Sequence, residues 1–183
     1  MSKKLFVITG PSSAGLRDII SALFEKRDDI APVLPVTARK MKAGETDGVG
    51  FKFYDLDGWN ELKEKGDLLE QTVFAGNDYG TSRALVNDVL ASGKHALINL
   101  EVERAAQIKK NMPEAVCIFV EPSDPEILKQ RFSRTHRCSP LEITVRMQDA
   151  DRQRELSGFC DARVDSNDEA KAIDEIGSII DKA

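Results

Sequence analysis

The sequence predicts an α/β fold in which helices flank a parallel β-sheet. Three runs of residues, 5–9, 95–100 and 116–120, are rich enough in apolar and β-branched side chains to form buried strands. A helical spacing of apolar residues follows each run, and this alternation is typical of parallel sheets. With 183 residues, the chain is long enough for one domain with a substantial core and modest insertions.

A loop framed by glycines follows the first strand. Residues 10–15 read Gly-Pro-Ser-Ser-Ala-Gly, and Ile19, Leu23 and Phe24 then recur at helical spacing. This is the outer frame G-x-x-x-x-G of a phosphate-binding P-loop, in which backbone N–H groups form an anion nest at the start of a helix. The candidate nucleotide-phosphate residues are therefore Gly10, Pro11, Ser12, Ser13, Ala14 and Gly15.

The two residues after the second glycine depart from the P-loop motif. The motif continues with a lysine that contacts the β- and γ-phosphates and a serine or threonine that holds Mg²⁺. This chain has Leu16 and Arg17 instead. Leu16 supplies neither group. Arg17 restores a positive charge one position later and is a candidate catalytic residue, and the alternative is a solvent-facing Arg17 in an ordinary strand–helix turn.

Further helices are predicted from caps and apolar spacing. One follows the second predicted strand and ends before Pro113. Residues 123–126 and 139–142 both match a capping box, in which a serine side chain and a glutamate three residues later satisfy the first N–H groups of a helix. A final helix carries Ile176 and Ile180 on its apolar face.

Two segments interrupt the strand–helix alternation. Residues 34–93 contain many glycines and short aromatic runs, and they predict a small β-rich insertion that includes a helix over 82–91. Residues 131–137 form a basic patch, which is either a solvated face or part of a lid over 131–148. The predicted core then consists of residues 1–33, 94–130 and 149–183.

Composition limits the classes of partner. The 26 basic and 31 acidic residues give a net charge of −5, which argues against a nucleic-acid partner. No apolar run approaches membrane-spanning length, and the start of the chain lacks the apolar region of a signal peptide. The three cysteines are widely spaced, and His95 and His136 are isolated, so we expect reduced thiols, no metal site and a cytoplasmic protein.

Several short stretches, in a fixed order along essentially the whole chain, resemble guanylate kinase. The resemblance implies a P-loop NTPase-type α/β core, a GMP-binding insertion and a mobile helical lid. It also implies transfer of the γ-phosphoryl group of ATP to GMP, with Mg²⁺. The stretches are 8–12 (Ile-Thr-Gly-Pro-Ser), 37–40 (Thr-Ala-Arg-Lys), 43–48 (Ala-Gly-Glu-Thr-Asp-Gly), 69–70 (Leu-Glu), 76–82 (Gly-Asn-Asp-Tyr-Gly-Thr-Ser) and 165–168 (Asp-Ser-Asn-Asp).

The resemblance implies a site for the GMP phosphate in the insertion. Arg39 matches the first phosphate-binding arginine of the family and is also a candidate catalytic residue. Lys42 stands where a second arginine is usual, and lysine cannot grip phosphate with arginine's planar fork. Phe51 replaces one phosphate-binding tyrosine, whereas Tyr79 matches the other.

The resemblance also implies a guanine-binding site. Glu70 matches the acidic residue that accepts hydrogen bonds from the guanine edge, and Glu101 stands for the family's aspartate there. A carboxylate suits guanine because the N1–H and the exocyclic amine are adjacent donors. Thr81 keeps a hydroxyl at a guanine-contacting position, whereas Pro35 replaces a serine and cannot donate a hydrogen bond.

On the ATP side, the resemblance implies that Arg131 and Arg146 are catalytic lid arginines, with Arg134 offset by one position. Asn167 falls in the family's nucleotide-binding element near the end of the chain. Asn99 replaces an aspartate, which removes a charge useful for Mg²⁺. A surface salt bridge remains the alternative role for Arg146.

Three functions are therefore open. The first is a guanylate kinase whose turnover is impaired by the changes at Leu16 and Arg17, with ATP and Mg²⁺ as cofactors if it is active. The second is a non-catalytic relative that binds GMP, another phosphorylated ligand or a protein partner. The third, a kinase for another small phosphoryl acceptor, explains Pro35, Lys42 and Phe51 but leaves the lost lysine unexplained, and ranks last.

Overall fold

The computed structural model describes residues 3–135 and 138–183, so His136 and the end of the predicted basic patch lie outside the described residues. Its core is a five-stranded sheet in which every pair of neighbours is parallel. The three predicted strands are confirmed as the central ones, and the two short edge strands were not predicted. Across the sheet the strands are β2 (Ile30–Pro32), β7 (His95–Asn99), β1 (Leu5–Thr9), β8 (Val116–Glu121) and β9 (Ala162–Asp165).

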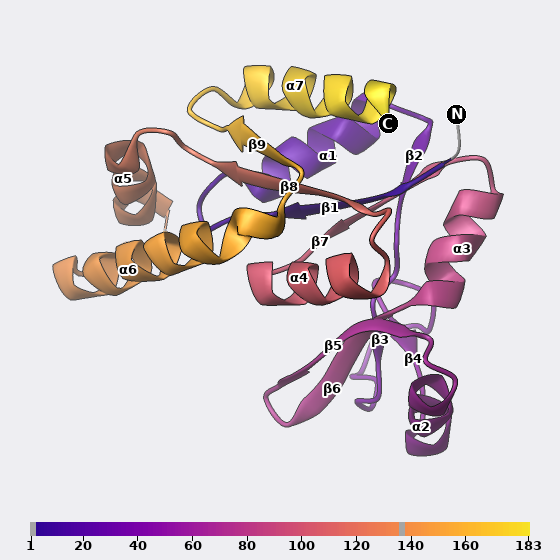
Figure 1. Cartoon of the computed structure of the whole chain (residues 1–183). Helices are drawn as coiled ribbons and strands as arrows, with labels where there is room; N and C mark the ends of the chain where they lie inside the picture. The colour runs from indigo at the N-terminus through magenta and orange to yellow at the C-terminus, as the bar shows by residue number, and fades with distance from the viewer. Residues whose placement is uncertain (1–2, 136–137) are drawn as a thin grey trace.

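Helices cover both faces of this sheet (Figure 1). In β1, Leu5 and Val7 pack against the helices on one face of the sheet. Phe6 and Ile8 pack against the helices on the opposite face. A strand buried on both faces is apolar at successive positions, which explains the continuous run from which it was predicted. The helices on the Leu5 face are α3 (Arg83–Ala91) and α4 (Val102–Asn111), and those on the Phe6 face are α1 (Leu16–Lys26) and α7 (Glu169–Lys182).

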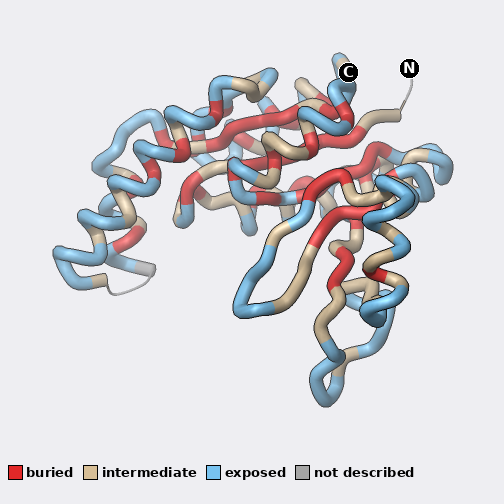
Figure 2. Tube along the Cα trace, turned by 60° about the horizontal axis from the view of Figure 1, so that its bottom comes forward, coloured by how far each residue is buried: buried red, intermediate tan, exposed pale blue. Residues whose placement is uncertain are grey.

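The β-rich part of the predicted insertion forms a second, four-stranded sheet that extends away from the core (Figure 1), whereas its predicted helix over 82–91 is α3 and packs on the core sheet. It also contains helix α2 (Leu56–Glu64), whose Trp59 side chain is fully buried. The tip of its hairpin is exposed, as the pale trace in Figure 2 shows. The strands in order are β4 (Lys52–Phe53), β3 (Val36–Thr37), β6 (Asn77–Ser82) and β5 (Leu68–Phe74).

Helices α5 (Pro125–Thr135) and α6 (Pro140–Leu156) pack against each other at one end of the core, and η1 (Ser157–Phe159) follows them. The predicted capping box at the start of α6 is confirmed, because Ser139 and Glu142 bond to each other's backbone N–H groups. No described helix is long and apolar enough to cross a membrane.

The capping box predicted at residues 123–126 is wrong. The Ser123 hydroxyl donates to Asp165 at 2.8 Å instead of capping α5. The N–H of Glu126 donates to the Asp124 carboxylate at 2.9 Å, so Asp124 caps the start of this helix. The reason is tertiary, because the end of β9 brings a competing acceptor to Ser123 that the local sequence does not reveal.

Candidate functional site

The glycine-framed loop has the backbone of a phosphate cradle. Gly15 caps α1 in the left-handed conformation, with φ of 90°, and Ser13 also has a positive φ of 64°. A Cβ at Gly10 would lie 2.0 Å from the carbonyl oxygen of Val120, so only glycine fits there. The loop therefore turns tightly at the end of β1 and directs the N-terminus of α1 into the space in front of it.

A cavity of about 700 Å³ lies in front of this loop. Residues 10–18 line it, together with Arg131 and Glu169, which lie close to the loop. Glu169 approaches the loop closely, because its Oε1 would lie 3.1 Å from a Cβ at Gly15. An anion in this cavity meets backbone N–H groups and arginines, but also carboxylates, because Asp18, Glu101, Asp149 and Glu169 are all in the lining.

The first turn of α1 does not replace the missing P-loop lysine. Leu16 packs with the apolar cluster between α1 and α7. Arg17 lies at the rim of the cavity with 93% of its side chain exposed, and its Nε is 3.3 Å from the Asp18 carboxylate. Arg17 therefore faces solvent, as the second of the two interpretations of the sequence predicted.

Both predicted lid arginines contact the loop. Arg131 donates from Nη2 to the carbonyl of Ser166 at 2.8 Å and from Nη1 to the carbonyl of Ser13 at 3.5 Å. Arg146 donates to the Ser12 hydroxyl at 3.4 Å, and its guanidinium lies 5.6 Å from the Phe132 ring centroid. Helices α5 and α6 thus bring two positive charges to the cradle, whereas Arg134 is exposed on α5.

The residues around the cradle suit a phosphate better than a magnesium ion. Asn99 uses its amide to donate to the carbonyl of Ile8 at 2.9 Å. In the part of the chain that the structure describes, no three His, Cys, Asp or Glu side chains gather in a way that could hold a metal ion. The backbone cradle therefore suits a phosphate group, such as those of the ATP that the family resemblance implies.

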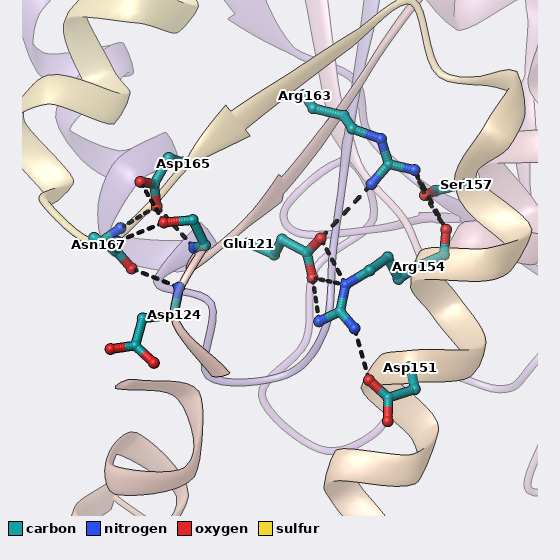
Figure 3. A network of polar contacts seen from close by, with 9 residues as sticks. Glu121, Asp124, Asp151, Arg154, Ser157, Arg163, Asp165 and Asn167 are labelled. Carbon is teal, nitrogen blue, oxygen red and sulfur yellow. Dashed lines mark hydrogen bonds and ion pairs between the residues drawn. The ribbon is translucent and has the colours of Figure 1, made fainter. Parts of the chain in front are cut away.

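Asn167 is engaged in a structural network (Figure 3). Its amide nitrogen donates to the Ser123 hydroxyl at 2.7 Å, and its amide oxygen accepts from the backbone N–H of Asp124 at 3.4 Å. The same figure shows Arg154 of α6 bound through Nε to both carboxylate oxygens of Glu121, each at 2.9 Å. These contacts fix the starts of α5 and α7 and tie α6 to β8.

In the insertion, Arg39 forms a bidentate ion pair with Glu45, with both N···O distances at 2.6 Å. Its guanidinium also lies over the rings of Phe51 and Phe53, at 5.2 and 5.0 Å. Hydrogen bonds from Arg39, and then from the backbone N–H of Lys42, lower the pKa of Glu45 to about 2. The pair is therefore ionised throughout the neutral range.

A second cavity, of about 490 Å³, lies between the insertion and the core. Tyr79 and Phe51 form part of its wall, with ring centroids 5.9 Å apart. Apolar side chains make up most of the remainder, including Pro35 and Phe74. The structure thus brings the predicted residues Phe51, Tyr79 and Glu101 to one cavity. Arg39 and Lys42 lie outside its lining, Arg39 largely covered and Lys42 exposed.

Glu70 is buried beside this cavity in an ion pair that was not predicted. Arg104 donates from Nε and Nη2 to the two carboxylate oxygens, at 2.7 and 2.8 Å. The Thr81 hydroxyl donates to the same carboxylate at 2.7 Å. The sequence held one signal for Arg104, which comes three residues after Glu101 at the start of α4. That spacing explains the 3.7 Å ion pair between Arg104 and Glu101.

A sequence model of the family described as guanylate kinase matches residues 2–183. The chain belongs to the guanylate kinase family. Guanylate kinases from Synechococcus sp. (strain CC9311) and Oceanobacillus iheyensis are 34% and 31% identical to it. Their matches cover 93% and 96% of this chain, and 90% and 85% of the two relatives.

Solved structures share the guanylate kinase fold. The crystal structure of guanylate kinase from Anaplasma phagocytophilum aligns with a TM-score of 0.69 at 22% identity, over 99% of this chain and 86% of that one. The SH3-kinase fragment of tight junction protein 3 aligns with a TM-score of 0.54 at 16% identity, over 98% of this chain and 57% of the fragment. At these identities the likeness establishes the α/β fold with its parallel sheet.

Proposed function

We propose that this member of the guanylate kinase family captures a phosphate monoester of the nucleotide class in the second cavity, between its insertion and its core. We further propose that transfer of the γ-phosphoryl group of ATP to that ligand is impaired. The first turn of α1 supports the second part most directly, because Leu16 is apolar and the Arg17 side chain is 93% exposed.

Capture of the phosphate rests on Arg39 and Tyr79. Arg39 uses three of its five N–H groups in hydrogen bonds to Glu45 and to the carbonyl of Lys40, and its side chain is 10% exposed, so a phosphate must share or replace these partners. The guanidinium is already held in place by Glu45 and by the aromatic rings beneath it. A phosphate that binds there meets a preorganised donor and pays little for ordering it.

Impaired transfer rests on the chemistry of the reaction. Phosphoryl transfer depends on positioning and on charges that stabilise the transition state, and removal of one such group typically costs about 10²–10³ in rate. Here the lysine and the hydroxyl of the P-loop are both replaced. Arg131 and Arg146 lie close enough to the loop to compensate in part.

The decisive test restores the P-loop side chains. In an assay of ADP release with ATP, Mg²⁺ and a nucleoside monophosphate, Leu16→Lys with Arg17→Ser should raise kcat at least about 100-fold. Leu16→Ala with Arg17→Ala is the matched control and should not raise it. Rapid ADP release by the unmodified protein, with no gain in the restored variant, would show that the P-loop is not the limiting defect.

Non-catalytic binding is the second candidate function, favoured by the contrast between the altered P-loop and the intact Arg39–Glu45 arrangement. Calorimetric titrations with ATP–Mg²⁺ and, separately, with a nucleoside monophosphate distinguish the two. Binding of the monophosphate without ADP release supports the non-catalytic function, and slow turnover supports the impaired kinase.

A further inference from the structure

The carboxylate that the family resemblance assigns to guanine recognition is already paired within the protein. Arg104 presents two adjacent N–H donors to the two oxygens of Glu70, at 2.7 and 2.8 Å. Guanine presents the same arrangement, an N1–H beside an exocyclic amine, to a carboxylate. The guanidinium of Arg104 therefore occupies the hydrogen-bonding sites on Glu70 that a guanine base would use.

Glu70 has no access to a ligand in the second cavity. Its side chain is 0% exposed, and the Thr81 hydroxyl donates to the same carboxylate at 2.7 Å. The lining of the cavity includes Arg104 but neither Glu70 nor Thr81, although all three residues are described. A base that enters the cavity therefore meets the guanidinium first.

The contact that remains does not satisfy guanine's paired donors. Guanine N1–H and its amine are donors and find no acceptor on Arg104, which offers only donors and can meet only the acceptors O6 and N7 of the base. Among the described residues, Glu101 is the one carboxylate in the lining, and its oxygen lies 3.7 Å from Arg104 Nη1 although its side chain is 71% exposed. The rest of the wall is mainly apolar and aromatic, with Pro35, Phe51 and Phe74 among its residues.

We propose that Arg104 is a specificity-determining residue that excludes guanine, so that the cavity takes a phosphate monoester whose organic group lacks guanine's paired donors. This inference rests on the proposed capture of a phosphate monoester and names its substrate class. Because the ion pair is bidentate and Glu70 is fully buried, displacement of Arg104 by a ligand leaves two charges to be satisfied at once.

The first measurement uses the unmodified protein, with GMP and AMP as size-matched probes in calorimetric titrations. The expected result is that GMP binds no more than about threefold more tightly than AMP. A preference for GMP of about tenfold or more would overturn the proposal. If neither nucleotide binds, the proposed phosphate capture fails, and the variant below decides the role of Arg104 by itself.

The second measurement removes the guanidinium. In Arg104→Ala, GMP binding should tighten at least about tenfold, while AMP binding changes less than about threefold. The double variant Arg104→Ala with Glu70→Gln is the matched control and should lose the gain, because the paired acceptor is gone. No gain for GMP in a folded Arg104→Ala protein would overturn the proposal.

Loss of Arg104 leaves a buried carboxylate unpaired, so folding needs its own control. Methylguanidinium at millimolar concentration should raise the Tm of Arg104→Ala and compete with GMP, but should do neither in the unmodified protein. If Arg104→Ala does not fold, Arg104→Lys keeps the charge without the planar fork and should still tighten GMP binding more than about threefold. An unchanged GMP affinity in Arg104→Lys would count against guanine exclusion.

Discussion

At the scale of single residues, the arginines in and beside the two cavities are already bonded to groups of the protein. Arg39 is paired with Glu45, Arg104 with Glu70, and Arg131 with the carbonyls of the loop and of Ser166. Such pairs hold a guanidinium in a fixed direction, but a ligand must share or replace its partners. The partner of each arginine therefore decides which ligand chemistry its cavity accepts.

Gly10→Ala should destabilise the protein, because its Cβ would lie 2.0 Å from the backbone oxygen of Val120. Backbone cannot give way as a flexible side chain can, so a loss of at least about 1–3 kcal/mol in the free energy of unfolding is expected. Urea denaturation measures it. Gly158→Ala is the matched control, since a Cβ there meets nothing within 4 Å. Equal stability of the two variants would contradict the close packing of the loop.

The Arg39–Glu45 pair should make stability depend on pH. The pKa of Glu45 falls from its ordinary 4.5 to about 2, so the folded state favours the ionised carboxylate. The stabilisation is then complete above about pH 4.5 and is lost as the pH falls toward 2. The measurement is the difference in Tm between the unmodified protein and Glu45→Gln, followed from about pH 7 to about pH 3.

The Tm difference for Glu45→Gln should be constant at neutral pH and shrink below about pH 4.5. Glu64→Gln, a change of the same kind at an exposed carboxylate on α2, serves as the control. A difference for Glu45→Gln that stays level to about pH 3 would contradict the assigned pairing.

At the scale of elements, α6 is held at both ends and packs on α5 through a small apolar cluster between them. Its N-terminus has the capping box of Ser139 and Glu142, and near its C-terminus Arg154 is bound to Glu121 of β8 (Figure 3). Leu141 and Val145 on its first half are exposed. The helix thus positions Arg146 over the loop through its two ends and through this small cluster, rather than through a large apolar face.

Ser139→Ala should weaken the start of α6, because it removes the acceptor for the N–H of Glu142 and the partner of the Glu142 carboxylate. A loss of about 0.5–2 kcal/mol in unfolding free energy is expected. Hydrogen exchange of the first turn of α6 should accelerate. Ser178→Ala, within α7, tests the same chemical change without a cap and should leave stability within about 0.5 kcal/mol.

At the scale of the whole molecule, the insertion is anchored to the core by β5. Leu69 of this strand is buried in the cluster beneath α3 and α4. The next residue, Glu70, makes the ion pair with Arg104 of α4, and Asn111 donates to the carbonyl of Leu69 at 2.8 Å. Apolar packing and hydrogen bonds therefore both join β5 of the insertion to the helices of the core.

We expect this anchoring to make the molecule unfold in a single transition. Trp59, the only tryptophan of the chain, is fully buried in the insertion and reports on it by fluorescence. Far-UV circular dichroism reports mainly on the helices of the core. The two signals should change at the same urea concentration. An earlier loss of the Trp59 signal would show that the insertion unfolds on its own.

Leu69→Ala provides the comparison for this experiment. Loss of a fully buried leucine should cost about 2–5 kcal/mol and affect the insertion and core signals alike. Coincident transitions in the unmodified protein and a common shift in the variant together support a single cooperative unit.

The sequence by itself determined the features that arise from neighbouring residues. The continuous apolar runs that became β1, β7 and β8, the capping box at Ser139 and the glycine frame of residues 10–15 each depend on a few adjacent positions. The order of short motifs along the chain was enough for the guanylate kinase family. The placement of β2 and β9 at the sheet edges was missed, because strands of three and four residues give little periodic signal.

Only the tertiary structure decided which partners the charged residues take. Arg104 and Glu70 are 34 positions apart, and Ser123 and Asp165 are 42 apart, so no local pattern relates them. The same holds for Arg17, which faces solvent, while Arg131 and Arg146 reach the loop from helices more than a hundred residues away. A motif specifies which groups are present, but their chemistry depends on what folding places beside them, since a buried carboxylate takes its hydrogen-bond partners from the protein around it.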